Sequence, residues 1–353
     1  MMVRAILLAL AASLLPGAGP SYRLALPGYR YQFPRDHFEH PEFRTEWWYY
    51  TGNVRNEEGR RFGFELVFFR QAQRRGASDN PSAWRVDDMY LAHLALTDID
   101  GKRFFSHRRL NRAGPGIAGA SLEKRRIWNG NWSAQWQDDK QTLLAIAPEF
   151  QFELRLRPLK QPVIHGRNGV SQKAAGAGRA SHYVSFTRLA VDGRISLDGK
   201  NHRATGTAWM DHEWFTHQLG DDQVGWDWFS IQFEDGSDLM LVQLRKKDGS
   251  VDSHSTGTYV DGKGATKHLT SSDFRLHPVS FWKSSKTGAR YPVRWRISAP
   301  ALGIELEATA ALDHQELAHG DTNYWEGSVI YNGTRKGAGY MEMTGYDKAL
   351  RLD

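Results

Sequence analysis

The stretch WMDHEWFTH, residues 209–217, places an Asp, a Glu, two His and two Trp within nine positions. A zinc protease helix reads H-E-x-x-H, because histidines four residues apart lie on one helical face. Here His212 and His217 are five apart, which at about 100° per residue turns the second imidazole roughly 140° away from the first. A loop would be needed to bring both histidines and Glu213 onto one ion. We therefore predict no metal site and no cofactor.

A β-strand through the same residues would divide them between two faces. Trp209, Asp211 and Glu213 would share one face, and Met210, His212 and Trp214 would share the other. A carboxylic acid that an apolar, aromatic surround keeps neutral can protonate carbon, and aromatic faces stabilise the resulting cation by about 0.5–2 kcal/mol per ring. Asp211 beside Trp209 therefore indicates proton-transfer chemistry. The alternative is a structural pair, with Asp211 and His212 buried at a strand end and Asp211 bonded to backbone N–H groups.

Several other residues allow either a functional or a structural interpretation. His93 lies in an apolar strand pattern, where a lone histidine is more often a core residue than a ligand contact. Glu46 and Glu326 are either further carboxylates of a site or strand-edge partners of arginine. Lys173 is an exposed loop lysine or a contact for an anionic head group. Four tryptophans either line a pocket or fill a core, namely Trp47, Trp226, Trp228 and Trp325.

Composition and motifs remove several classes of function. The 353 residues include no Cys, which excludes disulfides, thiol nucleophiles and thiolate metal sites. The net charge of +6 is scattered along the chain, and we predict no nucleic-acid partner because such proteins concentrate their basic residues. The sequence contains no G-x-S-x-G nucleophile turn, no Walker A loop and no dinucleotide-binding glycine motif.

The first 20 residues have the pattern of a cleaved secretory signal peptide. Arg4 precedes an apolar run from Ala5 to Leu15, which is shorter than the roughly 20 residues that span a bilayer. The small residues around Ala12–Ser13 or Gly17–Gly19 would hold the cleavage site. We therefore expect an exported protein, secreted or periplasmic, and the alternative is an uncleaved membrane anchor.

The rest of the chain alternates in the manner of β-strands. Every second residue from Phe62 to Phe68 is large and apolar, and turn signals return roughly every 8–12 residues, as in β-sandwiches and barrels. Residues 46–70 resemble residues 225–245, so a repeated β unit is expected. We place one domain at 21–190 and a second at 191–353, with a long loop or lid at 160–180. The best candidate for a helix is the short segment 313–320.

Seven stretches are informative together: TEWWYYTGNV (45–54), LAHLALTD (91–98), TGTAWMDHEW (205–214), GWDWFSIQFEDG (225–236), YPVRWRISAP (291–300), YWEGSV (324–329) and GYMEMTGY (339–346). Their combination resembles the AttH-like, carotenoid 1,2-hydratase-related family of exported lipocalin-like proteins. The resemblance implies an all-β fold of two lipocalin-like (calycin) antiparallel β-barrel domains packed together, with an apolar ligand pocket. It also implies kinship with enzymes that add water across an isoprenoid C=C bond, and with fungal lipocalin-like cyclases.

The same resemblance implies roles for individual residues. In the hydratases, the Asp of a matching D-H motif is the proposed proton donor and an upstream histidine assists it, which implies Asp211 as donor with His212 and His182. This chain has Val184 where the hydratases carry a Trp, and Trp209 where they carry a Tyr, which favours an activity other than carotenoid hydration. The residues expected to contact the substrate are Trp47, Trp209, Trp214, Trp226, Trp228, Tyr324, Trp325, Glu326 and His93.

Two functions remain open at this point. An enzyme would catalyse acid-promoted hydration, cyclisation or isomerisation of a C=C bond in an apolar isoprenoid or lipid ligand, and it requires Asp211 in an apolar cavity with a raised pKa. A non-enzymatic periplasmic lipid-binding or carrier protein would work with a membrane export system. In that protein, backbone donors or an arginine would lower the pKa of Asp211.

Overall fold

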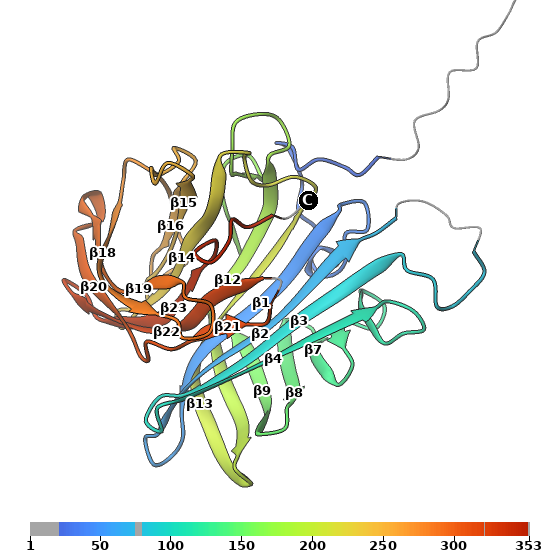
Figure 1. Cartoon of the computed structure of the whole chain (residues 1–353), viewed down its shortest axis with the longest axis horizontal. Coiled ribbons are helices and arrows are strands. Elements are labelled where there is room, and N and C mark those ends of the chain that lie inside the picture. The colour runs from blue at the N-terminus through green and yellow to red at the C-terminus, as the bar shows by residue number, and fades with distance from the viewer. Residues whose placement is uncertain (1–20, 75–79, 321, 352–353) are drawn as a thin grey trace, which may run out of the picture.

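The computed structural model describes residues 21–74, 80–320 and 322–351. The signal peptide expected at 1–20 lies outside these residues. The helices within them are two single turns of 3-10 helix, η1 (Arg35–His37) and η2 (Pro300–Leu302). None of the described helices has the length and apolarity needed to cross a membrane. Two large antiparallel sheets make up the rest of the regular structure, which confirms the all-β prediction (Figure 1).

The first sheet is built from residues 45–215. Its strands are β1 (Thr45–Arg55), β2 (Arg61–Ala72), β3 (Asp88–Asp98), β4 (Arg103–Arg112), β5 (Ala118–Ser121), β6 (Arg126–Asn129), β7 (Trp132–Gln137), β8 (Lys140–Ile146), β9 (Phe150–Pro158), β10 (Val163–Ile164), β11 (Ser171–Gln172), β12 (Ala180–Leu197) and β13 (Lys200–Phe215). They pair in the order β4-β3-β2-β1-β13-β12-β9-β8-β7-β6-β5, with β10 and β11 also on β12. The sheet curls so that Asn129 on β6 bonds both Tyr90 O on β3 (3.0 Å) and Asn111 on β4 (2.6 Å).

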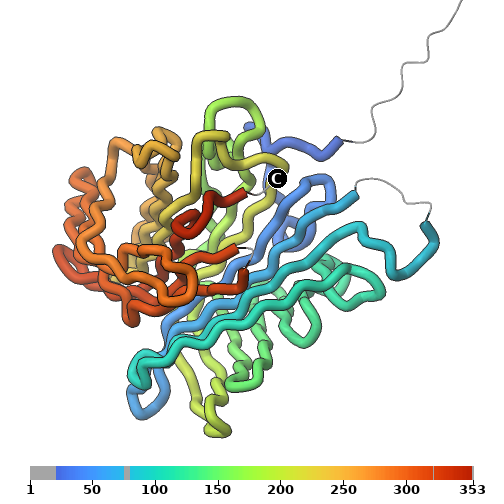
Figure 2. The backbone as a smooth tube through the Cα atoms, viewed as in Figure 1, coloured from blue at the N-terminus to red at the C-terminus, as the bar shows by residue number. Residues whose placement is uncertain are grey.

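The second sheet is built from residues 223–343. Its strands are β14 (Gln223–Phe233), β15 (Asp238–Lys246), β16 (Thr256–Val260), β17 (Thr266–Thr270), β18 (Arg275–Lys283), β19 (Arg290–Ala299), β20 (Ile304–Ala310), β21 (Glu316–Ala318), β22 (Asn323–Gly333) and β23 (Gly337–Met343). The order is β17-β16-β15-β14-β23-β22-β20-β19-β18, with β21 on β22. Figure 2 shows the two curled sheets side by side, and the red β22–β23 hairpin lies against the blue β1–β2 hairpin.

The chain passes from one sheet to the other between Phe215 and Gln223, later than the sequence suggested. The expected boundary at residue 190 falls inside β12, which pairs with β9 and β13 within the first sheet. Segment 160–180 contributes β10 and β11 to that sheet, so its glycines mark turns rather than a linker. The helix expected at 313–320 is wrong: β21 pairs with β22 there, because so short a segment cannot stabilise a helix alone.

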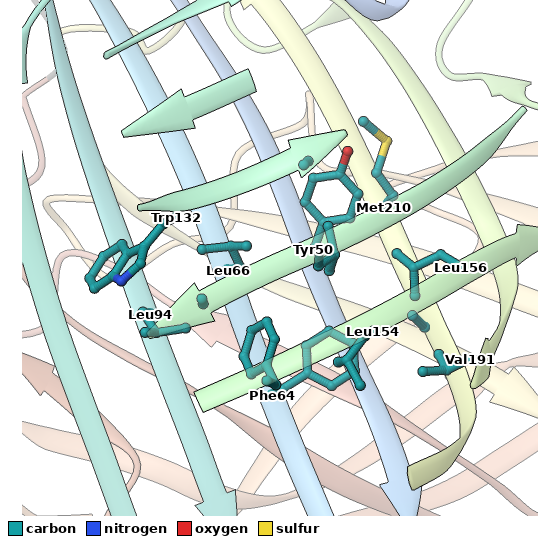
Figure 3. Close-up of a cluster of buried hydrophobic side chains, with 14 of the residues drawn as sticks. Tyr50, Phe64, Leu66, Leu94, Trp132, Leu154, Leu156, Val191 and Met210 are labelled. Atoms are coloured by element: carbon teal, nitrogen blue, oxygen red, sulfur yellow. The ribbon is translucent and has the colours of Figure 1, made fainter. Parts of the chain in front are cut away.

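Large apolar side chains fill the inside of the first sheet. Alternate residues of β1, β2 and β3 point into it, because successive side chains of a strand face opposite sides. Figure 3 shows this packing, in which the labelled side chains are Tyr50, Phe64, Leu66, Leu94, Trp132, Leu154, Leu156, Val191 and Met210. The inside of the barrel is therefore a packed core rather than a ligand pocket.

The other face of the same strands is also buried, because the second sheet covers it. Tyr49, Val67 and Trp209 of the first sheet pack with Trp228 and Val242 of the second in one cluster. The strands of the first sheet that meet the second therefore carry apolar and aromatic residues on both faces. A barrel that stood alone would expose the second of these faces to water.

An ion cluster around Asp238 also joins the two sheets. Asp238, at the start of β15, is fully buried. It accepts hydrogen bonds from Lys160 (2.7 Å), Thr187 (2.9 Å) and Arg188 (2.7 Å), which all belong to the part of the chain that forms the first sheet. Two partly buried cations therefore depend on one carboxylate of the opposite sheet.

Replacement of Asp238 by Ala is expected to lower the free energy of unfolding by about 3–5 kcal/mol, because the cations of Lys160 and Arg188 lose their partner inside the protein. Urea denaturation followed by tryptophan fluorescence measures this change. Asp192→Ala is the matched control, since Asp192 also pairs with two arginines, Arg155 and Arg203, but at the exposed surface. A loss no larger than in the control would contradict the role of Asp238 in joining the sheets.

Candidate active site

A cavity of about 520 Å³ lies between the outer face of the first sheet and the second sheet. Most of its surface is apolar. Trp47, Phe69 and Leu91 line it from the first sheet, and Trp228 and Val242 line it from the second. Its size and its apolar lining suit a small organic ligand.

Asp211 lies in the wall of this cavity, in the middle of the first sheet. Strand β13 runs between β1 and β12, and its Asp211 stands opposite Tyr49 on one side and Ser185 on the other. Tyr183 donates a hydrogen bond to Oδ2 of Asp211 (2.6 Å), and the Trp209 indole N–H donates to Oδ1 (2.6 Å). The Ser185 hydroxyl also bonds Oδ1. Three neutral groups thus hold the carboxyl group in one orientation.

Burial raises the pKa of Asp211 to about 7, although the hydrogen bonds from Ser185, Tyr183 and Trp209 oppose this shift. The described residues include no ion pair to Asp211, so no cation offsets the cost of burying its charge. Near neutral pH the protonated and ionised forms are both populated. Such a carboxyl group can give a proton to a ligand and recover it.

A hydrogen-bonded line leads from Asp211 into the protein. Ser185 Oγ lies 2.6 Å from Nε2 of His165, and Nδ1 of His165 lies 2.9 Å from Thr258 Oγ1 on the second sheet. His165 is buried, and this burial, together with Lys173, lowers its pKa to about 3, so the imidazole is neutral. A neutral imidazole has one donor and one acceptor nitrogen. Because hydroxyls rotate, the line can donate toward Asp211 or accept from it, and both protonation states of Asp211 are satisfied.

The next carboxylate on this face, Glu213, is in a different state. Lys173 Nζ lies 3.1 Å from Glu213 Oε1, and both side chains are buried. Gln218 (3.0 Å) and Ser181 donate to the same oxygen. Glu213 is thus an ion-paired carboxylate whose Oε1 already has three partners. The expectation that Lys173 is an exposed loop lysine is wrong, because β11 and the loop after it carry this residue to the cavity wall.

The second sheet supplies polar groups to the opposite wall. Tyr324 lines the cavity; its hydroxyl donates to Glu65 (3.0 Å) and lies 2.7 Å from Nδ1 of His93. Burial, with His319 nearby, lowers the pKa of His93 to about 3, so its imidazole is neutral. Glu342 lines the cavity as well. The cavity therefore has carboxyl groups on walls from both sheets.

The structure brings together many, but not all, of the residues expected at the site. Asp211 shares the cavity with Trp47, Trp226, Trp228, Tyr324 and His93. Trp209 packs directly beside Asp211, and Glu326 lies behind the cavity, bonded to the Tyr49 hydroxyl. Trp325 points the other way, into the core of the second sheet.

His212, His182 and Trp214 lie on the opposite face of the first sheet from Asp211, so the structure does not place the two histidines beside the proposed donor. His212 Nε2 bonds Glu46 (2.8 Å). Nδ1 of His182 bonds Gly169 O (2.9 Å), and the ring lies against Trp214. Adjacent residues of a strand face opposite ways, so the D-H pair cannot act on one ligand.

The carboxylate of Glu46 is the centre of a buried ion network. His40 Nδ1 (2.6 Å) and His212 Nε2 (2.8 Å) share its Oε1, and Arg70 Nε lies 3.2 Å from Oε2. The ligand atoms of His40, Glu46 and His212 lie within 4.8 Å of one another. Asp36 engages the other nitrogen of His40 (3.4 Å). Hydrogen bonds and the Arg70 charge therefore account for these groups without a metal ion, and Glu213 is turned away from His212.

Sequence reasoning missed four residues of the site: Tyr183, Ser185, His165 and Glu342. Tyr183 and Ser185 lie one position either side of Val184, in a strand whose partner was not known. His165 is in a segment that its composition marked as a loop. One signal was available, since Glu342 stands between two methionines in GYMEMTGY, and a polar residue alternating with apolar ones must face a different surface.

The chain is similar to proteins of known family and structure. The AttH-like family matches residues 24–346. A crystal structure from Nitrosomonas europaea, assigned as AttH, has 34% sequence identity and a TM-score of 0.82, covering 92% of this chain and 99% of that chain. Kievitone hydratase from Nectria haematococca has a TM-score of 0.68 at 13% identity, covering 93% of this chain and 99% of that one. CghA, solved with Sch210972, has a TM-score of 0.52 at 13% identity, with 86% and 89% covered. No curated protein matches significantly. The two more distant structures share the fold of this chain.

The raised pKa of Asp211 predicts a pH-dependent stability difference between the wild type and Asp211→Asn. The pKa of Asp211 is about 7 in the folded protein, against an ordinary value of 3.8 for this side chain. Between these values the folded state holds a proton that the unfolded state has lost, so this group makes the wild type less stable as the pH rises from 4 to 7. Asn does not titrate, so the variant should gain on the order of 3 kcal/mol relative to wild type over that range.

Urea unfolding measures the free energy of unfolding of both proteins. It is repeated between about pH 4.5 and 8, in steps of about one pH unit. Asp192→Asn is the control, because Asp192 is exposed and its pKa is lowered by Arg155. A stability difference between wild type and Asp211→Asn that stays constant with pH would show that Asp211 is ionised throughout.

Proposed function

The chain belongs to the AttH-like family, and from this premise we propose that it binds an apolar isoprenoid or lipid ligand in the cavity between its sheets and protonates a C=C bond of that ligand through Asp211. Hydration, cyclisation or isomerisation would follow this step. Its lipocalin-like, hydratase-type fold is shared with kievitone hydratase and CghA. The cavity, rather than the fold, supports the choice of chemistry.

One observation carries the proposal: Asp211 lies in the wall of an apolar cavity, its pKa is raised to about 7 by burial, and no described cation pairs with it. Burial of this charge costs stability at neutral pH, and groups used for proton transfer commonly carry such a cost. The hydrogen bonds from Tyr183, Ser185 and Trp209 fix the direction in which the acid presents its proton.

The reaction begins when the proton on Asp211 moves to one carbon of the double bond, which leaves Asp211 as a carboxylate and the other carbon as a cation. The rings of Trp47, Trp226 and Trp228 line the same cavity and stabilise that cation through their faces. Water then adds to the cation and loses a proton in hydration, a second double bond adds in cyclisation, and loss of a different proton gives isomerisation.

A second candidate is a non-enzymatic lipid-binding or carrier protein that works with a membrane export system. The observation that favours it is the cavity itself, whose apolar surface suits a lipid whether or not chemistry follows. This protein would keep its ligand unchanged, and Asp211 would only hold a polar group of that ligand. The same experiment separates the two candidates.

Asp211→Asn is expected to lower turnover by about 10²–10⁴-fold, because the amide has no proton to donate, and to leave ligand uptake intact. The ligand is obtained by purifying the protein from its host, extracting it with organic solvent and identifying the bound lipid by mass spectrometry. Wild type, Asp211→Asn and the exposed control Asp192→Asn are then compared for uptake and for product formation. Equal product formation in all three would end the enzyme proposal, and uptake without product would favour the carrier.

We also propose that the protein is exported, secreted or periplasmic, after cleavage of residues 1–20. The support is the arrangement of Arg4, the apolar run and the small residues after it, together with the absence of cysteine. Mass spectrometry of the intact protein from a periplasmic or culture fraction should give a mature chain that lacks this segment. An intact N-terminus in the cytoplasmic fraction would contradict export.

A further inference from the structure

Glu342 is a carboxyl group of the cavity wall that the function proposed above does not use. It lies on β23, stands opposite Trp228 of β14 and Glu326 of β22, and is partly exposed to the cavity that it lines. Its neighbours Met341 and Met343 point into the core of the second sheet. The alternation of the strand therefore turns the Glu342 carboxyl group toward the wall that holds Asp211.

Two contacts between the sheets bring Asp211 and Glu342 together. On one side, Tyr49, which stands beside Asp211 in the first sheet, bonds Glu326, which stands beside Glu342 in the second. On the other side, the Trp228 indole N–H donates to the Tyr183 hydroxyl (3.1 Å), which bonds Asp211. The two carboxyl groups thus face the same space, enclosed by a ring of contacts.

Among the residues that the structure describes, Glu342 has no counter-ion. The ion pairs among the described residues include none to Glu342, Glu326 or Glu65. The second oxygens of Glu65 and Glu326 are buried without a hydrogen-bond partner. Burial raises the pKa of Glu342 to about 8; a hydrogen bond from Trp226 opposes this shift, and the charge on Asp211 adds to it. Because each charge raises the pKa of the other, Glu342 and Asp211 cannot both ionise near neutral pH, and the pair keeps at least one proton.

Arg44, Arg70, His93 and Arg351 line the same cavity as Glu342. The other ionisable groups around Glu342 come from several elements, and one of them, Lys173, is a cation. They are Tyr49 on β1, Glu65 on β2, Lys173 after β11, Tyr183 on β12, Asp211 and Glu213 on β13, Tyr324 and Glu326 on β22 and Tyr340 on β23. Lys173 is already paired with Glu213. The charged groups that act on the pKa of Glu342, after burial, are Asp211 and Glu213.

We propose that Glu342 is the second catalytic carboxyl group of this cavity, the base that takes a proton from the attacking water while Asp211 supplies the proton to carbon. This inference rests on the function proposed above. Glu213 is less suited to the role, because Lys173, Ser181 and Gln218 already occupy its Oε1. Glu342 stands on the wall opposite Asp211, which leaves the ligand between the two groups.

The step balances with water as the only co-reactant. The reactive form of the pair carries its proton on Asp211 and leaves Glu342 ionised. A proton passes from Asp211 to one alkene carbon, and the oxygen of water forms a bond to the other carbon. One proton of that water passes to the Glu342 carboxylate, which leaves the alcohol, an ionised Asp211 and a protonated Glu342. Transfer of the proton from Glu342 back to Asp211, through water in the cavity once the product has left, restores the starting state.

A titration without substrate tests whether the two groups form a pair. Carboxyl carbons of Asp and Glu are labelled with ¹³C, and their NMR shifts are followed against pH in wild type, Asp211→Asn, Glu342→Gln and Glu123→Gln. Removal of either member should lower the apparent pKa of the other by about one unit, and the two shifts should be equal because coupling is reciprocal. Exposed Glu123 is the control and should change neither. If neither pKa moves, the two carboxyl groups are not coupled and the proposal is overturned.

Turnover in D₂O separates this proposal from the one on which it rests. The probe is a phenol that carries a 3-methylbut-2-enyl group, with recovered alkene and alcohol both analysed by mass spectrometry. Wild type should deuterate the alkene and form alcohol, and Asp211→Asn should do neither. Glu342→Gln should still deuterate the alkene, because Asp211 is intact, but should form alcohol at least about 10²-fold more slowly.

Two other results would contradict the roles of Asp211 or Glu342. A wild type that neither deuterates nor hydrates this probe contradicts acid chemistry at Asp211 on prenyl groups, and the role of Glu342 falls with it. If Glu342→Gln hydrates at the wild-type rate, the role of Glu342 is wrong while the function of Asp211 stands. Thermal melting of both variants confirms that they are folded, since each replaces a carboxyl group by an amide of the same shape.

Discussion

The second sheet covers the outer face of the first, and the chemistry of the molecule depends on this burial. A strand turns alternate side chains to opposite faces. In β1, β2 and β13 one face fills a barrel while the other meets a second layer of protein. Groups that would be solvated on a free-standing barrel are thus desolvated, including Glu65 and Asp211. The raised pKa values follow from this enclosure and from the scarcity of cations within it.

Ionisable groups on the two faces of the first sheet, around β1 and β13, have different surroundings and different pKa shifts. On the face of the barrel interior, Glu46 receives two imidazoles and Arg70; burial alone would raise its pKa, but these partners hold it below the usual range. On the other face, Asp211 receives only hydroxyl and indole donors, and burial dominates. The first arrangement stabilises the folded chain through compensated charge. The second costs stability at neutral pH, as groups poised for proton transfer commonly do.

Much of the fold could be predicted from the sequence, because period-two patterns and turn residues are local signals. The alternation around Asp211 placed Trp209 and Asp211 on one face, as the structure has them. The structure differs from the predicted domain boundary at residue 190 and from the predicted helix at 313–320, because strand pairing over long distances outweighs local composition. The prediction that His212 assists Asp211 is unsupported for a related reason, since His212 is next to Asp211 in the chain but on the other face of the sheet. His165, by contrast, is 46 positions away in the chain and connects to Asp211 through Ser185. No pattern within one strand could show that Glu342 faces Asp211, because that relation exists only once two sheets have docked.

The line from Asp211 through Ser185 and His165 to Thr258 runs behind the cavity wall and not across its interior. A bulky ligand that fills the cavity and displaces its water would still leave these hydrogen bonds in place. The hydrogen bond that adjusts when Asp211 loses or recovers its proton therefore survives the exclusion of water from the cavity.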